Sequence, residues 1–373
     1  MEPVRVAIIA GKMNSGGKKS LIMEYYRHID REKIQFDFIC DSDSQSIPEK
    51  EILELGGRVY RITPYQNILK NMNDMRKIIQ QNKYKIVHAY NSTMNIYPMA
   101  VAKYCNVPVR ISESISMAHA GDWKTPIKIV LKSMSKWYAN YYMACGTDCG
   151  RWQFGNKLFN AGKVDVFKTV INTEFNSFSP MLREKTRKKY GWDDKIVVGH
   201  IGRFTAQKNS VRVIEIFNAV VQKEPNAVLC LIGDGELKEK VLKRIEDLGI
   251  RKQVAYLGRR EDIQQFYNAM DCFLLPSIYE GLPVVGLESE SCGLPMFFST
   301  EITREANACE LGHFLSLSDN NDIWAEQILK ACRESMPIRR SHSEEVAAFG
   351  FDSKSEALRL QEYYLDAIKR EMK

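Results

Sequence analysis

The sequence lacks any apolar run near the roughly 18 residues that a membrane-spanning helix needs, so we expect no such helix. It also lacks a signal-peptide layout, because Met1-Glu-Pro-Val-Arg5 leads directly into an apolar stretch. The nine cysteines are scattered, and Cys145 and Cys149 have the wrong spacing for a C-x-x-C redox or zinc pair. These absences predict a protein of the reducing cytoplasm.

Nucleic-acid and P-loop motifs are missing as well. The chain has no zinc-finger spacing or RNP-like aromatic motif, which argues against nucleic acid as a partner. The segment Gly11–Ser20 begins like a Walker A loop, but Gly17 and Lys18 stand where that loop needs Lys and then Ser or Thr. Lys238 likewise breaks a dinucleotide-binding G-x-G-x-x-G that would begin at Gly233. The sequence therefore argues against a P-loop NTPase and a dinucleotide-binding enzyme.

Charge is distributed unevenly along the 373 residues. Residues 1–175 contain 25 lysines and arginines against 16 acidic residues, a net charge of +9, whereas residues 176–373 contain 28 against 30, a net charge of −2. This asymmetry predicts that the first half meets an anionic partner. The chain is also too long for one ordinary core, so we expect two domains.

What the chain does contain is a repeated alternation of apolar strands and helical segments. This alternation predicts an α/β fold with doubly wound parallel sheets, in which ligands bind beyond the carboxyl ends of the strands. A polar segment, Asn172–Pro180, is the expected linker. The expected strands are Val4–Ala10, Ile34–Cys40, Val59–Ile62, Lys85–Ala89, Val107–Ser112, Tyr141–Cys145, Val164–Ile171, Ile196–Ile201, Ala227–Ile232, Val254–Leu257, Cys272–Leu275 and Met296–Ser299.

The stretch from Pro276 to Glu288 follows one of these strands and carries distinctive chemistry. Pro283 is the expected first helical residue, because its fixed φ suits a helix start. Gly281 allows a ligand to approach the backbone, and the free N–H groups of the first helical turn favour an anion. Glu280 and Glu288 beside an anion site indicate hydrogen bonds from neutral groups such as sugar hydroxyls. The alternative is a capped helix with two surface glutamates.

The spacing from Glu280 to Glu288 resembles the E-x7-E signature of the retaining family-four glycosyltransferases, which have the GT-B fold. The resemblance covers nearly the whole chain and is strongest to the transferases of bacterial capsule and exopolysaccharide assembly. Further matching motifs occur in the expected order: Gly202-Arg-Phe-Thr-Ala-Gln-Lys-Asn209, Ile232-Gly-Asp-Gly235, Leu257-Gly-Arg-Arg260 and Asp271-Cys-Phe-Leu-Leu-Pro-Ser277.

The resemblance implies two Rossmann-like domains facing a deep cleft. Residues 1–175 would bind the acceptor, residues 176–354 the nucleotide sugar, and the C-terminal helix 355–373 would cross back onto the first domain. The implied reaction is retaining transfer from a nucleotide sugar, with UDP the expected nucleotide, to a glycan or lipid-linked acceptor in bacterial surface polysaccharide synthesis. The alternative is a catalytically inactive nucleotide-sugar-binding subunit of a transferase complex. The intact set of Arg203, Lys208, Glu280 and Glu288 favours the enzyme.

The resemblance assigns the donor phosphates to Arg203 and Lys208, helped by the loop at Gly16 and Gly17. Arginine can bind two phosphate oxygens at once, whereas lysine supplies a point charge. Together with the helix start near Gly281, these cations can replace a metal, so no metal or other cofactor is expected. Surface ion pairs are the alternative for both residues.

The remaining donor contacts also come from the resemblance. Glu280 is expected on hydroxyls of the donor sugar, Glu288 on the ribose, and Arg259 near the base. The turn before the signature helix adds Gly281, Leu282 and Pro283.

One departure from the family concerns a cleft histidine, which relatives usually carry just after the strand equivalent to Val107–Ser112. Here the window Ser112–Ser116 holds no histidine; His88 ends an earlier strand, and His119 lies further on. Glu113 is expected to orient a donor hydroxyl or the acceptor. The alternative is that Glu113 only caps the next segment.

Four lysines recur every four residues in the expected helix Trp123–Tyr138 and form a lysine stripe of Lys124, Lys128, Lys132 and Lys136. The pattern is typical of a helix that lies on anionic lipid, which would place the protein peripherally at the inner face of the plasma membrane. The alternative is a solvated lysine face above a helix that is packed on the core.

Overall fold

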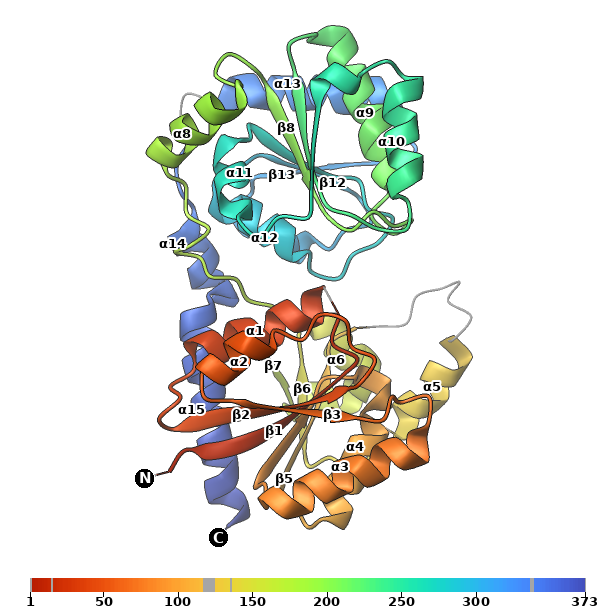
Figure 1. Cartoon of the computed structure of the whole chain (residues 1–373), viewed down its shortest axis with the longest axis vertical. Helices are drawn as coiled ribbons and strands as arrows, with labels where there is room; N and C mark the ends of the chain where they lie inside the picture. The colour runs from red at the N-terminus through yellow and green to blue at the C-terminus, as the bar shows by residue number, and fades with distance from the viewer. Residues whose placement is uncertain (1, 15, 117–124, 135, 336–338, 373) are drawn as a thin grey trace. The chain divides into compact units, whose positions relative to one another are not determined.

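The computed structural model describes residues 2–14, 16–116, 125–134, 136–335 and 339–372. The chain divides into two compact units (Figure 1). Unit 1 comprises Met1–Val170 and Ser353–Lys373, and unit 2 comprises Ile171–Asp352. Each unit is built on one parallel sheet, as the alternation of strands and helices predicts.

The sheet of unit 1 has seven strands in the order β3-β2-β1-β4-β5-β6-β7. Its central strands are almost entirely buried because helices cover both faces, although β4 and β5 include polar residues such as His88 and Glu113. The strands are β1 (Val4–Gly11), β2 (Ile34–Asp41), β3 (Arg58–Ile62), β4 (Ile86–Ala89), β5 (Val109–Ser114), β6 (Tyr141–Ala144) and β7 (Val164–Val166).

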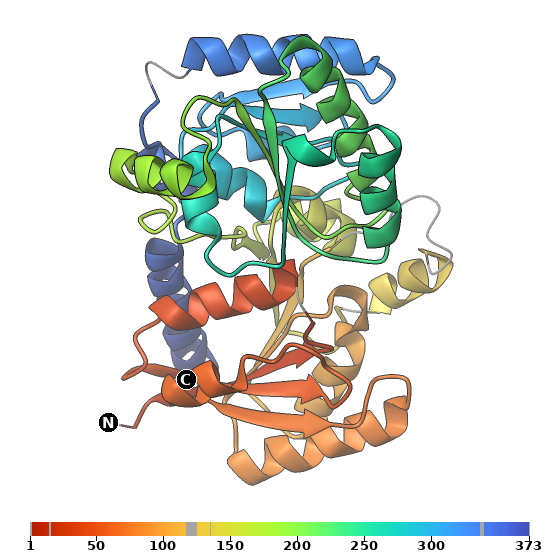
Figure 2. The same ribbon diagram turned by 45° about the horizontal axis from the view of Figure 1, so that its top comes forward.

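Successive residues of β1 point to opposite faces of this sheet. Val6 and Ile8 belong to the core on the side of α1 and α15, whereas Ala7 and Ile9 belong to the core on the side of α3 and α4. Figure 2 shows α1 and α3 on opposite faces. The helices are α1 (Gly17–His28), α2 (Glu49–Glu54), α3 (Ile68–Asn82), α4 (Ile96–Tyr104), α5 (Thr125–Met134), α6 (Thr147–Phe154), α7 (Asn156–Asn160) and α15 (Ser353–Glu371).

Helix α15 belongs to unit 1 although it ends the chain. Leu360 and Tyr364 are fully buried in the unit 1 core, and Tyr25 of α1 lies in the same cluster. The C-terminal helix is therefore part of the packing that stabilises the first sheet.

The sheet of unit 2 repeats the same arrangement, in the order β10-β9-β8-β11-β12-β13. One face packs on α9, α10 and α13, and the other on α11 and α12. The strands are β8 (Val197–Ile201), β9 (Val228–Ile232), β10 (Val254–Gly258), β11 (Cys272–Leu275), β12 (Met296–Ser299) and β13 (Gly312–Leu315). The helices are α8 (Pro180–Tyr190), α9 (Ser210–Lys223), α10 (Lys238–Asp247), α11 (Ile263–Ala269), α12 (Val284–Ser291), α13 (Asn321–Ser335) and α14 (Ser343–Val346).

Two local expectations differ from the structure. Strand β7 ends at Val166, not at Ile171, because Phe167 and Val170 leave the sheet and pack into the unit 1 core. Helix α8 was not predicted, since its sequence is highly charged and its buried residues, Thr186 and Arg187, are polar; Ser179 caps it, with Oγ accepting from Leu182 N at 3.3 Å. Among the helices of the described ranges, none combines the length and apolar character that a bilayer crossing requires.

Candidate active site

The candidate site of unit 2 lies where the strand order of its sheet reverses. Strands β9 and β10 lie on one side of β8, and β11 lies on the other, so the loops after β8 and β11 diverge from neighbouring strand ends. Two hydrogen bonds join these loops: Ile278 N donates to Gln207 O at 2.8 Å, and Gln207 Nε2 donates to Tyr279 O at 3.1 Å. The loops that carry the predicted residues thus form one connected structure.

Two of the predicted residues meet directly in this structure. Lys208 Nζ lies 2.6 Å from Glu280 Oε1, and the two side chains are only 18% and 10% exposed. Ser277 Oγ also donates to Glu280 Oε1, at 3.1 Å. A shielded pair of this kind places a cation and a carboxylate side by side at the switch point of the sheet.

Arg203 and Arg259 are placed differently. Both are exposed, Arg203 in the loop after β8 and Arg259 directly after β10. Neither forms a hydrogen bond or ion pair with any residue that the structure describes. The surface ion pair considered for Arg203 is therefore not formed, and its guanidinium is available to an anion.

The turn between β11 and α12 is open at Gly281. A Cβ added there meets no atom within 4 Å, so a ligand can approach the backbone. The expectation for Pro283 was wrong by one residue: Pro283 is the N-cap with extended ψ, and α12 begins at Val284. No side chain caps this helix, which leaves N–H groups of its first turn for a ligand. Leu282 is half-buried beside this turn.

Glu288, in the second turn of α12, is held by a residue that the sequence did not single out. Tyr267 OH donates to Glu288 Oε2 at 2.7 Å, and Tyr267 is fully buried on α11. Burial, with Glu288 nearby, raises the pKa of Tyr267 well above its usual range, so the hydroxyl stays a donor. An apolar helical pattern around an aromatic residue predicts only core packing, which is why this contact was missed.

His200 of β8 was also missed. It is fully buried, and its Nδ1 lies 2.9 Å from Leu274 O of β11. Burial, opposed by that carbonyl and reinforced by the charge of Lys208, lowers the pKa of His200 to about 4. A neutral imidazole therefore joins the two strands whose loops carry the site.

The glycines of the Ile232–Gly235 motif have a packing role. A Cβ at Gly233, whose φ is +145°, would lie 1.8 Å from Gly202 O, and one at Gly235 would lie 2.4 Å from Phe204 O. These glycines let the loop after β9 lie against the loop that carries Arg203.

Glu113 of unit 1 is buried, with 2% exposure. Its Oε2 lies 2.9 Å from His88 Nε2, and His88 Nδ1 lies 2.7 Å from Tyr364 OH. No side-chain cap by Glu113 is among its described contacts, and in this conformation the carboxylate faces His88 and not solvent. His119 lies outside the described residues, so the catalytic role predicted for Glu113 stays a prediction.

The remaining anion and metal expectations also concern unit 1. Helix α1 begins at Gly17 without a side-chain cap, and open space surrounds Gly16 and Gly17. Asp41 and Asp43, which follow β2 two residues apart, have other partners: Asn71 donates to Asp41, and Asp43 pairs with Lys12. Across the described ranges, no group of three His, Cys, Asp or Glu side chains is arranged to hold a metal ion.

The lysine stripe lies on and just after α5, with Lys124 outside the described residues. Ile127, Ile129 and Val130 of this helix are 57%, 55% and 61% exposed, so these three side chains are not packed on the core. Lys132 Nζ lies 5.0 Å from the ring centroid of Trp152 on α6. Helix α5 therefore presents both apolar and basic side chains to its surroundings.

Comparison with known proteins gives concordant results. The sequence matches the family described as glycosyl transferases group 1 over residues 183–345. The putative glycosyltransferase EpsF of Bacillus subtilis (strain 168) is 30% identical over 357 residues, covering 94% of this chain and 93% of the relative. The Escherichia coli UDP-Gal:alpha-D-GlcNAc-diphosphoundecaprenol alpha-1,3-galactosyltransferase is 23% identical, covering 94% of each chain.

Solved structures show the same fold. Anabaena HepE in complex with UDP-glucose superposes with a TM-score of 0.76 at 17% identity, covering 97% of this chain and 99% of the other. WaaG, a glycosyltransferase of lipopolysaccharide biosynthesis, superposes with a TM-score of 0.71 at 15% identity, covering 96% and 99%. The two parallel-sheet units are thus those of GT-B glycosyltransferases.

Proposed function

Because the chain belongs to the glycosyl transferases group 1 family and is similar over part of its length to a Vi polysaccharide biosynthesis protein of Salmonella typhi, we propose that it transfers a sugar, with retention at the anomeric carbon, from a UDP-sugar to a glycan or lipid-linked acceptor. The observation that carries the proposal is the shielded Lys208–Glu280 pair at the β8/β11 switch point, with Arg203 in the loop after β8 and without an ion pair to any described residue. This arrangement offers positive charge for phosphate and a carboxylate for hydroxyls.

The donor diphosphate binds to Arg203 and Lys208 in this proposal, near the open turn at Gly281. Negative charge grows on the β-phosphate as the bond to the anomeric carbon breaks, and fixed cations stabilise that charge. Each charged hydrogen bond contributes about 1.5–3 kcal/mol. Two cations and the start of α12 supply the charge that a metal provides elsewhere, so we expect activity to survive EDTA. Full loss in EDTA with recovery in manganese would contradict this part.

Glu280 exchanges partners during the cycle. In the structure it neutralises Lys208, so neither charge is left uncompensated in a partly buried place. Arrival of the diphosphate frees the carboxylate, because phosphate takes over Lys208. Glu280 then accepts hydrogen bonds from donor-sugar hydroxyls, Glu288 from the ribose, and Arg259 lies near the base.

Retention needs no enzymic nucleophile if the departing phosphate accepts the acceptor's proton while both partners are held in place. The proposal of UDP and a lipid-linked acceptor rests on relatives: the E. coli enzyme is named for UDP-Gal and a diphosphoundecaprenol acceptor, and HepE was solved with UDP-glucose.

We also propose that α5 contacts anionic membranes, where a lipid-linked acceptor would reside. The supporting observation is the exposure of Ile127, Ile129 and Val130 beside Lys128, Lys132 and Lys136. Apolar and basic side chains on one exposed helix suit the boundary between headgroups and acyl chains.

The decisive experiment combines binding and turnover. Thermal unfolding is followed with UDP, GDP, ADP and their sugar conjugates; ligand at about 100 times its dissociation constant stabilises by about 2.7 kcal/mol. The sugar nucleotide that binds is then incubated with lipid-linked acceptors, and NMR reads the anomeric configuration of the product. Stabilisation by GDP or ADP conjugates alone would rule out UDP as the donor nucleotide. A product with inverted anomeric configuration would rule out the retaining mechanism.

A further inference from the structure

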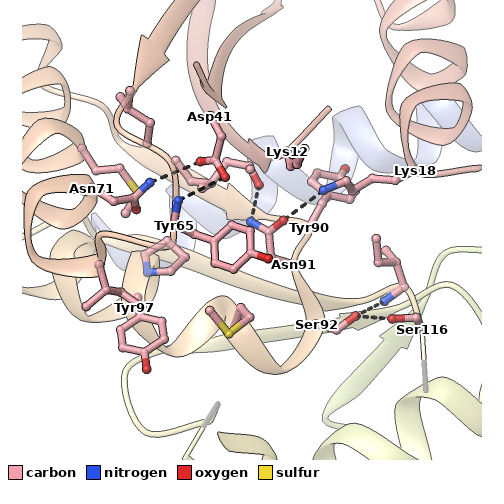
Figure 3. Close-up of a pocket in the computed structure, with 18 residues that line it drawn as sticks. Lys12, Lys18, Asp41, Tyr65, Asn71, Tyr90, Asn91, Ser92, Tyr97 and Ser116 are labelled. Carbon is pink, nitrogen blue, oxygen red and sulfur yellow. Dashed lines mark hydrogen bonds between the residues drawn. The ribbon is translucent and has the colours of Figure 1, made fainter. Parts of the chain in front are cut away.

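Unit 1 contains a pocket at the carboxyl ends of β1, β2, β3 and β4 (Figure 3). Strands β2 and β3 lie on one side of β1, and β4 lies on the other, so the pocket sits at the switch point of this sheet. Such points are where doubly wound sheets bind ligands. Its cavity of about 280 Å³ is at the small end of ligand pockets, which suits a single ring better than a chain.

Two opposite charges lie in this pocket without forming an ion pair. The carboxylate of Asp41 accepts from Asn71 Nδ2 at 3.2 Å and from Tyr65 N at 3.4 Å (Figure 3). Lys18 Nζ donates to Ala10 O and, at 3.1 Å, to Asn91 Oδ1. Within the described ranges, neither Asp41 nor Lys18 has an oppositely charged side chain within ion-pair distance. Each charge is therefore held by neutral groups and keeps capacity for a further hydrogen bond.

Burial leaves both charges poorly solvated. It raises the pKa of Asp41 and lowers the pKa of Lys18. A ligand that donates a hydrogen bond to the Asp41 carboxylate and accepts one from the Lys18 ammonium would compensate the poor solvation of both charges at once. Hydroxyl groups do this, because one oxygen is both donor and acceptor. An added carboxylate or phosphate would satisfy Lys18 but would meet the buried charge of Asp41.

Much of the remaining pocket lining is apolar. Ile62 and Met75 are almost fully buried, and Met94, Tyr97 and Pro98 contribute from the segment around α4. A sugar ring has the matching character, with C–H groups on its faces and hydroxyls around its edge. The other cation of the lining, Lys12, is neutralised by Asp43 at 2.6 Å, so the pocket has no excess positive charge for an anion.

We propose that this pocket binds the terminal sugar of the acceptor as an uncharged ring, with Asp41 and Lys18 as the specificity-determining residues. The proposal rests on the transferase function proposed above and adds the class of acceptor: a neutral hexose or acetamido sugar at the end that receives the new bond. Uronic acids and phosphorylated sugars are excluded from that position by Asp41.

Ligand-observed NMR on the full chain tests this directly. The probes are the methyl glycosides of glucose, galactose, N-acetylglucosamine and glucuronic acid, each titrated with and without UDP. At least one neutral glycoside binds, and the glucuronide binds more weakly. Asp41→Asn keeps the side-chain shape and an acceptor oxygen but removes the charge. We expect it to weaken the affinity for the neutral glycoside about tenfold or more.

Asp148→Asn is the matched control, because Asp148 is an exposed carboxylate of unit 1 on α6, and it leaves glycoside binding unchanged. Urea unfolding reports whether unit 1 of each variant is folded, and UDP affinity, assigned to unit 2, reports whether the donor site is intact. If Asp41→Asn does not fold, Lys18→Met provides the same comparison. Binding that is equal in wild type and variant, a preference for glucuronide, or no glycoside binding at all would overturn the proposal. Failure of UDP to bind wild type would instead overturn the proposed donor function, since glycoside binding is measured independently.

Discussion

Both units place ligand chemistry at the same topological position, but the two positions are built from different side chains. In unit 1 the β1/β4 switch point is a pocket with apolar walls in which Asp41 and Lys18 remain apart. In unit 2 the β8/β11 switch point carries the Lys208–Glu280 pair and the exposed Arg203 in loops. The comparison teaches that the strand order fixes where the two proposed sites lie, whereas the residues after each strand give each proposed site its own chemistry.

The largest expected effect comes from breaking the charge pair of unit 2. Glu280→Gln removes the carboxylate that we assign to the donor sugar, and kcat falls about 100-fold or more, while the free energy of unfolding changes much less. Steady-state kinetics and urea unfolding measure the two quantities. Glu301→Gln, an exposed neighbour, is the control and leaves both near wild type. If the Glu280 variant is mostly unfolded but its remaining folded fraction transfers sugar normally, the Lys208–Glu280 pair has a structural role and not a catalytic one.

The outer surface of unit 1 sharpens the comparison in another way, because only this unit is proposed to meet lipid. Changing Lys128, Lys132 and Lys136 to Gln weakens partition to anionic vesicles by about 1 kcal/mol per lysine, and salt reduces the difference. Co-sedimentation with vesicles measures it. The control changes three exposed lysines of unit 1 outside α5, Lys103, Lys157 and Lys163. If both triple variants bind the vesicles equally well, the lysine stripe is only a solvated face.

The sequence predicts both sheets because buried parallel strands are rich in apolar runs, such as Val228–Ile232 in β9. It also predicts that Lys208 and Glu280 belong to one site. In the structure Lys208 Nζ lies 2.6 Å from Glu280 Oε1. Composition and spacing alone could not give the exposure of Ile127 or Val130, since an apolar residue at helical spacing is consistent with both a core face and a free face.

The sequence could not predict the contacts between elements that are distant along the chain, for a different reason. Tyr267 and His200 lie in apolar segments, so their sequence context indicates core packing, and only the fold shows that each bonds a partner on another element. The pairing of His88 with Glu113 and the approach of Asn71 to Asp41 likewise depend on which strand ends lie beside each other. A polar side chain in a buried strand predicts a partner but does not identify it.

The two units also differ in what surrounds a buried carboxylate. Glu113 of unit 1 lies beside His88, whereas Glu290 of unit 2 is fully buried and accepts from the backbone N–H groups of Ala308 at 3.2 Å and Cys309 at 2.6 Å. Burial raises the pKa of Glu290 to about 7, from an ordinary value near 4.5 in the unfolded chain. Between these values the folded state holds a proton that the unfolded state releases. The free energy of unfolding therefore falls as pH rises through this window, by up to about 3 kcal/mol.

Urea unfolding of wild type and Glu290→Gln at several pH values from 5 to 8 isolates this contribution. The difference between the two proteins changes with pH in the expected direction, because glutamine cannot ionise. Glu236→Gln, an exposed carboxylate of unit 2, gives a difference that does not vary with pH. A constant difference for Glu290→Gln would mean that its carboxylate ionises normally in the folded state.

The smallest expected effect tests whether unit 2, like unit 1, uses a buried tyrosine behind its site. Tyr364 bonds His88 in unit 1, and Tyr267 bonds Glu288 in unit 2 at 2.7 Å. Tyr267→Phe keeps the buried ring and removes only the hydroxyl, so Glu288 loses one hydrogen bond, worth about 1.5 kcal/mol to a charged group. If Glu288 binds the ribose, KM for the donor rises about tenfold and kcat stays within about twofold, because the ribose contact is the same in ground state and transition state.

Tyr190→Phe is the control, since the Tyr190 hydroxyl has no hydrogen bond with the residues that the structure describes. A 2′-deoxyribose donor provides the decisive arm: if Tyr267 acts through the ribose contact, the variant and the wild type become nearly equal on that donor, whereas a general loss of stability would lower activity on both donors alike.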